Sequence, residues 1–148
     1  AMDTMRMETG YLHWGHDMSP EENQYEAGLQ FAISYKKNID FIGKEALLKI
    51  KDKKPNKKIV MLILKNNKPG EPLLLHDEPI YDENGIIGRT TSGNFSFNYN
   101  KNLAYGYINS ELSKEDLAKK NLFIEVEKKN YPASIILKPL NDKNIRII

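Results

Sequence analysis

The stretch Ile80-Tyr-Asp-Glu-Asn-Gly-Ile-Ile87 gives the clearest indication of the fold in this sequence. Two short apolar segments flank the dipeptide Asn84-Gly85. This dipeptide favours the positive φ angles that a tight β-hairpin turn requires. The pattern therefore predicts two antiparallel strands joined through residues 82–85.

Other stretches of strand length lie on both sides of this hairpin. They are either apolar runs rich in β-branched residues or alternations of apolar with polar or small residues. These predicted strands cover residues 28–33, 58–64, 103–108, 122–126 and 131–137. The last two are separated by residues 128–130, which predicts a second hairpin.

Only two helices are predicted after residue 40, and both are short. Over residues 43–51 apolar or small residues recur at the three-and-four spacing of a helix. Ser113 is expected to cap a helix that runs through Lys120, with Asp116 as a capping partner. The chain shows no alternation of strands with helices, so a parallel sheet is not expected. These features predict a mainly β chain, an antiparallel β-barrel or sandwich.

The composition excludes several classes of protein. Of the 148 residues, 40% are hydrophobic and 28% are charged, which is typical of a globular protein. No apolar run predicts a membrane span or a signal peptide, so no membrane partner is expected. The lack of cysteine excludes disulfides and is compatible with a cytoplasmic location. The abrupt start at residues 6–8 predicts that the natural protein begins further upstream.

Two local clusters contain side chains that could carry chemistry. His13, His16 and Asp17 suggest a metal site, but Gly15 disfavours the helix that would place both histidines on one face. A packed Trp14 beside hydrogen-bonded histidines is the preferred interpretation. The stretch Thr90-Thr-Ser-Gly93 suggests a nucleophile, although a turn satisfied by its own hydroxyls explains it better. No phosphate loop or dinucleotide fingerprint is present, so the residues by themselves indicate a β-rich binding or interface domain.

Three ordered motifs carry a resemblance to a known family. They are Glu8-Thr-Gly-Tyr-Leu-His-Trp-Gly-His-Asp17, Tyr25-Glu-Ala-Gly-Leu29 and Asp40-Phe-Ile-Gly-Lys-Glu-Ala-Leu47. Together they resemble the junction between the folate-binding domain and the C-terminal barrel in the glycine-cleavage T-protein (aminomethyltransferase) superfamily. The first motif looks most like the branch of sarcosine and dimethylglycine dehydrogenases. Leu12 and Gln24 depart from that branch.

The second half of the chain is similar to the barrel of the same family. The matching segments are Gly88-Arg-Thr-Thr-Ser-Gly93, Asn102-Leu-Ala-Tyr-Gly-Tyr-Ile108, Tyr131-Pro-Ala133 and Lys138-Pro-Leu-Asn-Asp142. The resemblance implies an antiparallel β-barrel over residues 43–148, preceded by the end of a folate-binding domain over residues 1–42.

The resemblance also implies a function. Enzymes of the dehydrogenase branch oxidise an N-methyl amine with FAD and pass the one-carbon unit to tetrahydrofolate. The flavin domain and the catalytic aspartate of that family lie upstream of the region that this chain resembles. The expected partners are therefore the upstream domains of the same polypeptide and a small-molecule amine. A free aminomethyltransferase without a flavin domain is the alternative within the superfamily.

Three residues correspond to positions near folate in that family. Glu8 matches a glutamate that grips the pterin, for which a carboxylate is suited because it accepts two N–H donors at once. Lys37 matches a position that is often basic, and Arg146 is placed to meet the glutamyl tail. The chain alone is expected to be inactive.

A small β-barrel that binds nucleic acid through lysines and aromatic residues is the alternative from another class of function. Six lysines lie within residues 49–58, and they face a single aspartate. The formal charge of the whole chain is only +2, however. No nucleic-acid partner is therefore expected.

Overall fold

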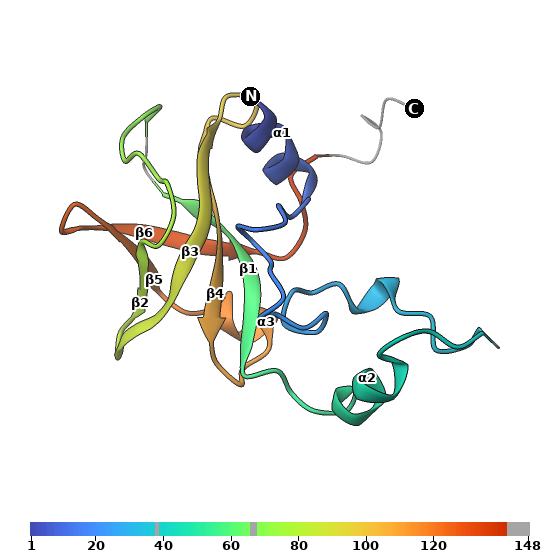
Figure 1. The fold of residues 1–148 in the computed structure, drawn as a ribbon. Coiled ribbons are helices and arrows are strands. Elements are labelled where there is room, and N and C mark those ends of the chain that lie inside the picture. The colour runs from blue at the N-terminus through green and yellow to red at the C-terminus, as the bar shows by residue number, and fades with distance from the viewer. Residues whose placement is uncertain (38, 66–67, 142–148) are drawn as a thin grey trace.

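Six strands close into a single barrel in the order β1-β4-β3-β2-β5-β6 (Figure 1), and every paired strand is antiparallel. The computed structural model describes residues 1–37, 39–65 and 68–141. The strands are β1 (Lys57–Leu64), β2 (Pro79–Asp82), β3 (Gly85–Ser96), β4 (Lys101–Asn109), β5 (Leu122–Val126) and β6 (Lys129–Ile136). The helical elements are α1 (Met2–Thr9), the 3-10 turn η1 (Gln30–Ala32), α2 (Lys44–Ile50) and α3 (Lys114–Leu117). The expected antiparallel barrel is confirmed.

Strand β1 is apolar on both faces because each face meets a different core. Val60, Leu62 and Leu64 belong to the core cluster that also holds Ile80 and Ile124. The alternate residues Ile59 and Met61 belong to a second cluster, which α1 covers. Side chains alternate between the faces of a strand, so one face of β1 packs in the barrel interior and the other packs in the cluster that α1 covers. This explains why its sequence is a continuous apolar run.

Helix α1 lies against the outside of the barrel (Figure 1) and anchors the N-terminal segment there. The side chain of Met7 on this helix is fully buried among Leu103, Tyr105 and Tyr107 of β4. The chain after β6 covers the other end of the helix, where the backbone N–H of Asn141 donates to the carbonyl of Glu8 at 3.0 Å. Helix α1 and the barrel therefore share one core.

Several local predictions are confirmed. The predicted hairpin between β2 and β3 is confirmed. Within its turn Gly85 has a positive φ of +136°, whereas Asn84 does not. The second hairpin turns at Glu127 and Lys128, whose φ angles are +51° and +62°. Ser113 caps α3 by accepting from the backbone N–H of Asp116 at 3.1 Å, but the helix ends at Leu117 rather than at Lys120.

Two local predictions are wrong. Residues 28–33 do not form a strand, because no neighbouring strand pairs with them; the 3-10 turn η1 occupies part of this stretch. The stretch from Thr90 to Gly93 is not a turn but lies inside β3, where the register with β4 shifts between Thr90 and Ser92. Gly93 is needed there for space, because a Cβ would come within 2.3 Å of the Cβ of Leu74.

Residues 29–37 and 39–56, which we call the arm, extend away from the barrel (Figure 1). The arm includes η1 and α2, and neither contains a buried residue. The predicted helix over residues 43–51 is thus confirmed as α2, and its apolar residues Leu47 and Ile50 are only partly buried. Among the described residues, no helix is long and apolar enough to cross a membrane.

Candidate functional site

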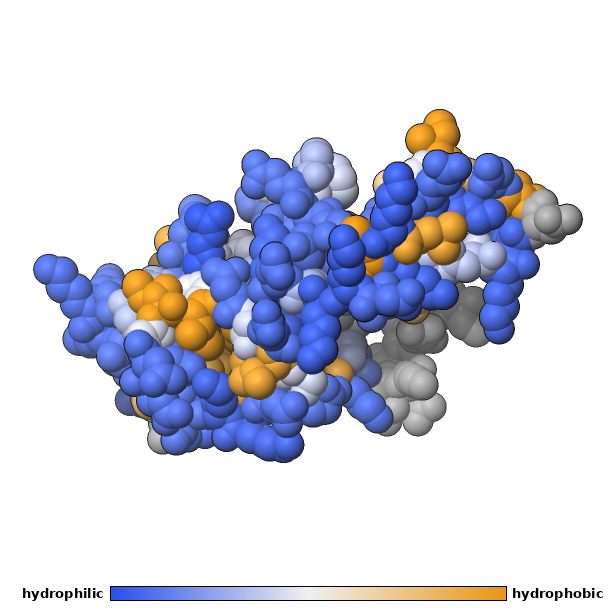
Figure 2. Space-filling model, turned by 90° about the horizontal axis from the view of Figure 1, so that it is seen from below, coloured by the Kyte–Doolittle hydropathy of each residue, from blue (hydrophilic) through white to orange (hydrophobic). Residues whose placement is uncertain are grey.

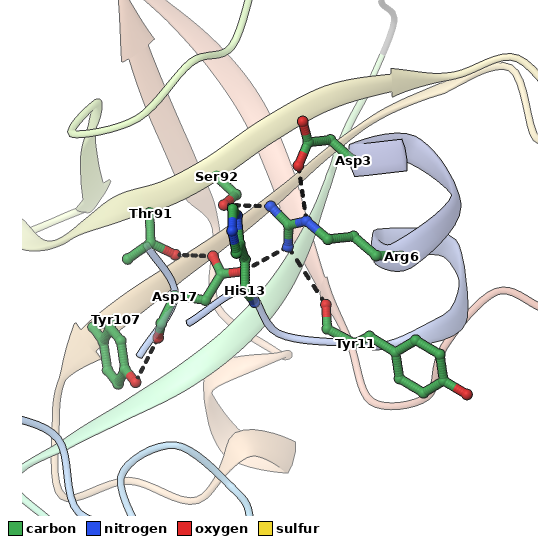
Figure 3. Close-up of polar contacts among 8 residues, drawn as sticks. All are labelled: Asp3, Arg6, Tyr11, His13, Asp17, Thr91, Ser92 and Tyr107. Carbon is green, nitrogen blue, oxygen red and sulfur yellow. Dashed lines mark hydrogen bonds and ion pairs between the residues drawn. The ribbon is translucent and has the colours of Figure 1, made fainter. Parts of the chain in front are cut away.

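A polar junction between α1, the loop after it and β3 is the most elaborate hydrogen-bonded site in the described part of the chain (Figure 3). Its centre is the guanidinium of Arg6. Nη1 lies 2.6 Å from Oδ2 of Asp17, and Nη2 donates to Oγ of Ser92 at 2.8 Å. Nε donates to Oδ1 of Asp3 at 2.9 Å. The planar group therefore ties one turn of α1 to the loop and to the barrel in fixed geometry.

Asp17 is fully buried, and its oxygens accept from several directions. Oδ1 accepts from the hydroxyl of Thr91 at 2.6 Å, and Oδ2 also accepts from the backbone N–H of His13 at 2.9 Å. Its backbone carbonyl accepts from the Tyr107 hydroxyl at 2.9 Å. A buried carboxylate needs such partners because its desolvation is otherwise very unfavourable. The junction thus holds a compensated buried ion pair.

The groups around the ion pair have shifted acidities. The hydrogen bond from Arg6 lowers the pKa of Asp3. Burial raises the pKa of Tyr107, and the nearby carboxylates of Glu22 and Asp17 raise it further. Burial also raises the pKa of Tyr105, with Asp17 adding to the shift. Both phenols therefore stay neutral, and Tyr107 serves the junction as a hydrogen-bond donor.

Glu8, the residue that the sequence assigns to the pterin, lies two residues after Arg6 on α1. Its side chain is buried, with 2% of the residue exposed. Oε1 accepts from the hydroxyl of Ser96, and Oε2 accepts from Nδ2 of Asn98 at 2.9 Å. Glu8 thereby joins α1 to the end of β3 and the turn that follows. A carboxylate can accept further hydrogen bonds, but that of Glu8 is closed to solvent in this structure. The role of Glu8 toward folate therefore stays a prediction.

The other two residues assigned to the cofactor do not join Glu8. Lys37 is exposed on the arm, which leaves the barrel near the start of β1 rather than beside α1 (Figure 1). Arg146 lies outside the described residues. The described residues of this chain therefore do not by themselves enclose a folate.

The histidine cluster does not form a metal site in the described part of the chain. The rings of His13 and His16 lie with their centroids 4.5 Å apart. No group of three or more potential ligands is gathered there or elsewhere among the described residues. Trp14 is 63% exposed, so the interpretation of a packed Trp14 is wrong. The loop uses its backbone, rather than its rings, to hold Asp17.

A cleft of about 760 Å³ lies between residues 15–22 and strands β2 to β4. Its charged groups are largely paired with one another. Lys57 Nζ lies 2.7 Å from Oε1 of Glu22, and His76 and Arg89 both face Asp77 at 3.0 and 3.5 Å. The hydroxyls of the cleft also have carboxylate partners: that of Ser19 donates to Glu22 at 2.7 Å, that of Thr91 to Asp17 at 2.6 Å, and that of Thr90 to Glu78. Neither Glu8 nor Lys37 lines it.

The sequence pattern alone does not predict this junction. Arg6 lies in the abrupt start of the sequence, and the pattern around Thr91 and Ser92 predicts a turn. Two consecutive threonines are frequent in strands, and this preference was the available sign that residues 90–92 lie in a sheet. The pairing of Arg6 with Asp17 depends on tertiary packing, and no spacing rule predicts it.

Comparisons with known proteins agree with the barrel and with the N-terminal segment. The family described as "Glycine cleavage T-protein C-terminal barrel domain" matches residues 57–142, and "GCVT N-terminal domain" matches residues 1–37. Mitochondrial dimethylglycine dehydrogenase of Rattus norvegicus is 36% identical over 95% of this chain and 16% of its own length. Aminomethyltransferase of Symbiobacterium thermophilum is 36% identical over 73% of this chain and 28% of its own length.

A solved structure shows the same fold. The glycine cleavage system aminomethyltransferase T of Bartonella henselae superposes with a TM-score of 0.78 at 25% identity. The match covers 94% of this chain and 37% of that structure. The chain thus spans between about one sixth and two fifths of the proteins named here.

Proposed function

This chain belongs to the glycine cleavage T-protein C-terminal barrel family, and from that membership we propose that it is the C-terminal part of a folate-dependent one-carbon transfer enzyme. The observation that carries the proposal is the order of the two family matches. Residues 1–37 match the N-terminal domain and residues 57–142 match the barrel, on one chain and in the sequence of the family.

Within this family the proposal favours an enzyme of the sarcosine or dimethylglycine dehydrogenase type. Dimethylglycine dehydrogenase is 36% identical over 95% of this chain, against 32% over 94% for an aminomethyltransferase of Synechococcus sp., and the higher identity supports that choice. Such an enzyme would oxidise an N-methyl amine with FAD and transfer the one-carbon unit to tetrahydrofolate. The amine and FAD would bind to upstream domains of the same polypeptide, and the enzyme would be cytoplasmic.

The residues of this chain have a positioning role in this proposal. The junction of Arg6 with Asp17 fixes α1 on the barrel, and α1 carries Glu8. The chain would therefore supply one wall of a folate pocket whose other walls come from upstream. To bind folate, Glu8 would have to release or share its hydrogen bonds from Ser96 and Asn98.

A free aminomethyltransferase is the second candidate, supported by the likeness to the Bartonella henselae structure. The complete gene separates the two candidates, since a dinucleotide fingerprint after an early strand marks the flavoenzyme. The nucleic-acid alternative is not favoured. Two lysines of the basic run are already engaged, Lys57 by Glu22 and Lys58 by the carbonyl oxygens of Ser110 and Leu112.

Calorimetric titration with a stable reduced folate tests the proposal. We expect the complete gene product to bind folate and this chain alone to bind it weakly or not at all, because a pocket shared between domains loses its preorganisation when one wall is isolated. In the complete product Glu8→Ala should weaken folate binding by about ten- to a hundred-fold, since bonds to a charged group contribute about 1.5 to 3 kcal/mol. Amine oxidation should be nearly unchanged, so free formaldehyde should accumulate.

Two further variants make this test specific. Glu8→Gln keeps the volume of the side chain and an acceptor for Ser96 but removes the charge, so it should weaken folate binding without loss of folding. Glu111→Ala changes an exposed glutamate remote from α1 and should leave the affinity as it is. Equal folate affinities for wild type, Glu8→Ala and Glu8→Gln would show that Glu8 does not hold the pterin.

A further inference from the structure

The arm has several large apolar side chains that remain partly or fully exposed in the described chain. Figure 2 shows apolar residues at the end of the molecule where Figure 1 places the arm. We call them the arm surface: Phe31 (83% exposed), Ile39 (72%), Phe41 (40%), Ile42 (104%) and Leu48 (47%). Single exposed apolar residues are ordinary, but a group of five within eighteen consecutive positions is typical of an interaction site.

Specific contacts hold the arm in a defined conformation. The hydroxyls of Tyr25 and Tyr35 are hydrogen bonded at 2.5 Å. The ammonium of Lys51 lies over the ring of Tyr35, 5.2 Å from its centroid, in a cation–π contact. Lys44 and Asp40 form an ion pair at 3.4 Å across the start of α2. The two tyrosine contacts therefore connect the two ends of the arm, whereas the ion pair is open to solvent, since the Asp40 side chain is 88% exposed.

The family matches indicate which partner this is. Phe31 lies within residues 1–37, which match the GCVT N-terminal domain, and the other four residues follow directly. The chain corresponds to only 37% of the solved aminomethyltransferase, so most of such a protein lies outside the region that this chain matches. We infer that the arm surface packs against the remainder of a GCVT-type N-terminal domain. This inference rests on the proposed function and adds the surface through which the two parts meet.

The charges on the arm agree with a protein partner rather than a lipid surface. Lysines are frequent along the arm, but Asp40, Glu45 and Asp52 are interspersed with them. A helix that lies in a membrane interface separates a basic face from an apolar face and is usually much longer than the seven residues of α2.

Hydrogen–deuterium exchange on this chain and on the complete gene product tests the inference. In the complete product we expect the amides of α2 to exchange at least about ten-fold more slowly than in this chain alone, because packing suppresses local opening. Ile42→Asp and Phe31→Asp should restore fast exchange in the complete product and lower its Tm. In this chain alone the same variants should leave the Tm unchanged, since both side chains face solvent there.

Leu73→Asp is the matched control, because Leu73 is also a loop residue and is 64% exposed but lies on the barrel. It should change neither exchange nor Tm in either protein.

Equal exchange of α2 in the two proteins would overturn the inference, as would a complete gene that encodes no such upstream domain. It would also be overturned if Ile42→Asp abolished self-association of this chain in sedimentation, or its binding to phosphatidylserine vesicles, without any effect on the complete product. The folate titration measures the folate pocket and not the packing of the arm. If α2 were protected in the complete product but folate did not bind, only the proposed function would be rejected.

Discussion

Asp17 is the residue on which the junction most depends, because it is a fully buried charge with three side-chain or backbone donors. Asp17→Asn would remove the charge opposite Arg6 and place an amide donor among other donors. Removing one partner of a buried ion pair usually costs 3 to 5 kcal/mol. Because Arg6 is 13% exposed and keeps its bond to Asp3, we expect a loss of about 3 kcal/mol in the free energy of unfolding.

Urea denaturation of this chain, followed by circular dichroism, measures this loss. Asp77→Asn is the matched control, since Asp77 is 62% exposed on the side chain and its pairs with His76 and Arg89 are open to solvent. Exposed ion pairs contribute about 0 to 1 kcal/mol, so this variant should change stability little. If the two variants had similar stabilities, the buried pair would not be what holds α1 in place.

At the scale of elements, the β2–β3 hairpin is connected to the segment after α3 by Asp82. Its carboxylate accepts from Lys120 at 2.7 Å and from the backbone N–H of Asn84 at 2.8 Å, and both bonds lower its pKa, Lys120 having the larger effect. A carboxylate with a lowered pKa stabilises the folded state above its unfolded pKa of 3.8, and this contribution is lost as the pH falls through the folded pKa. Asp82→Asn should therefore cost about 1 kcal/mol at pH 7 and progressively less below pH 4.

Denaturation at pH 7, 5 and 3 checks this dependence. The neighbouring exposed residue offers a control, because Glu83→Gln removes a carboxylate whose side chain makes none of these bonds. A cost of Asp82→Asn that stayed the same at pH 3 would mean that the charge of Asp82 contributes nothing and that only its packing matters.

The elements also show how far the sequence determines this structure. The two hairpins and the capped helix were predictable because Asn84-Gly85 and Ser113 act through local backbone chemistry. The strand predicted for residues 28–33 was wrong because alternation alone does not provide a neighbouring strand. Helix α1 was missed because its stability comes largely from Met7 in a distant core. Glu8 was selected by resemblance, whereas the junction around Asp17 arises only when residues 70 or more positions apart meet.

At the scale of the whole molecule, α1 and the barrel should unfold together because they share a core. Met7 is fully buried, whereas Met5 on the same helix is 64% exposed. Met7→Ala should lower the free energy of unfolding by about 2 to 5 kcal/mol, and Met5→Ala should change it by less than about 0.5 kcal/mol. Thermal unfolding should remain a single transition in both variants, seen by calorimetry. A separate early transition for Met7→Ala would mean that α1 detaches while the barrel stays folded.

The closure of the barrel has a consequence for how proteins of this family could have arisen. Each strand pairs with a neighbour on both sides, and β1 joins β6 to complete the ring. A ring of strands leaves no unpaired edge that a foreign chain could extend. Such a unit can be fused in the genome to unrelated upstream sequences without recruiting their strands. Recombination would then act upstream of α1, while α1 and the barrel, which share a core, pass together from one gene architecture to the next.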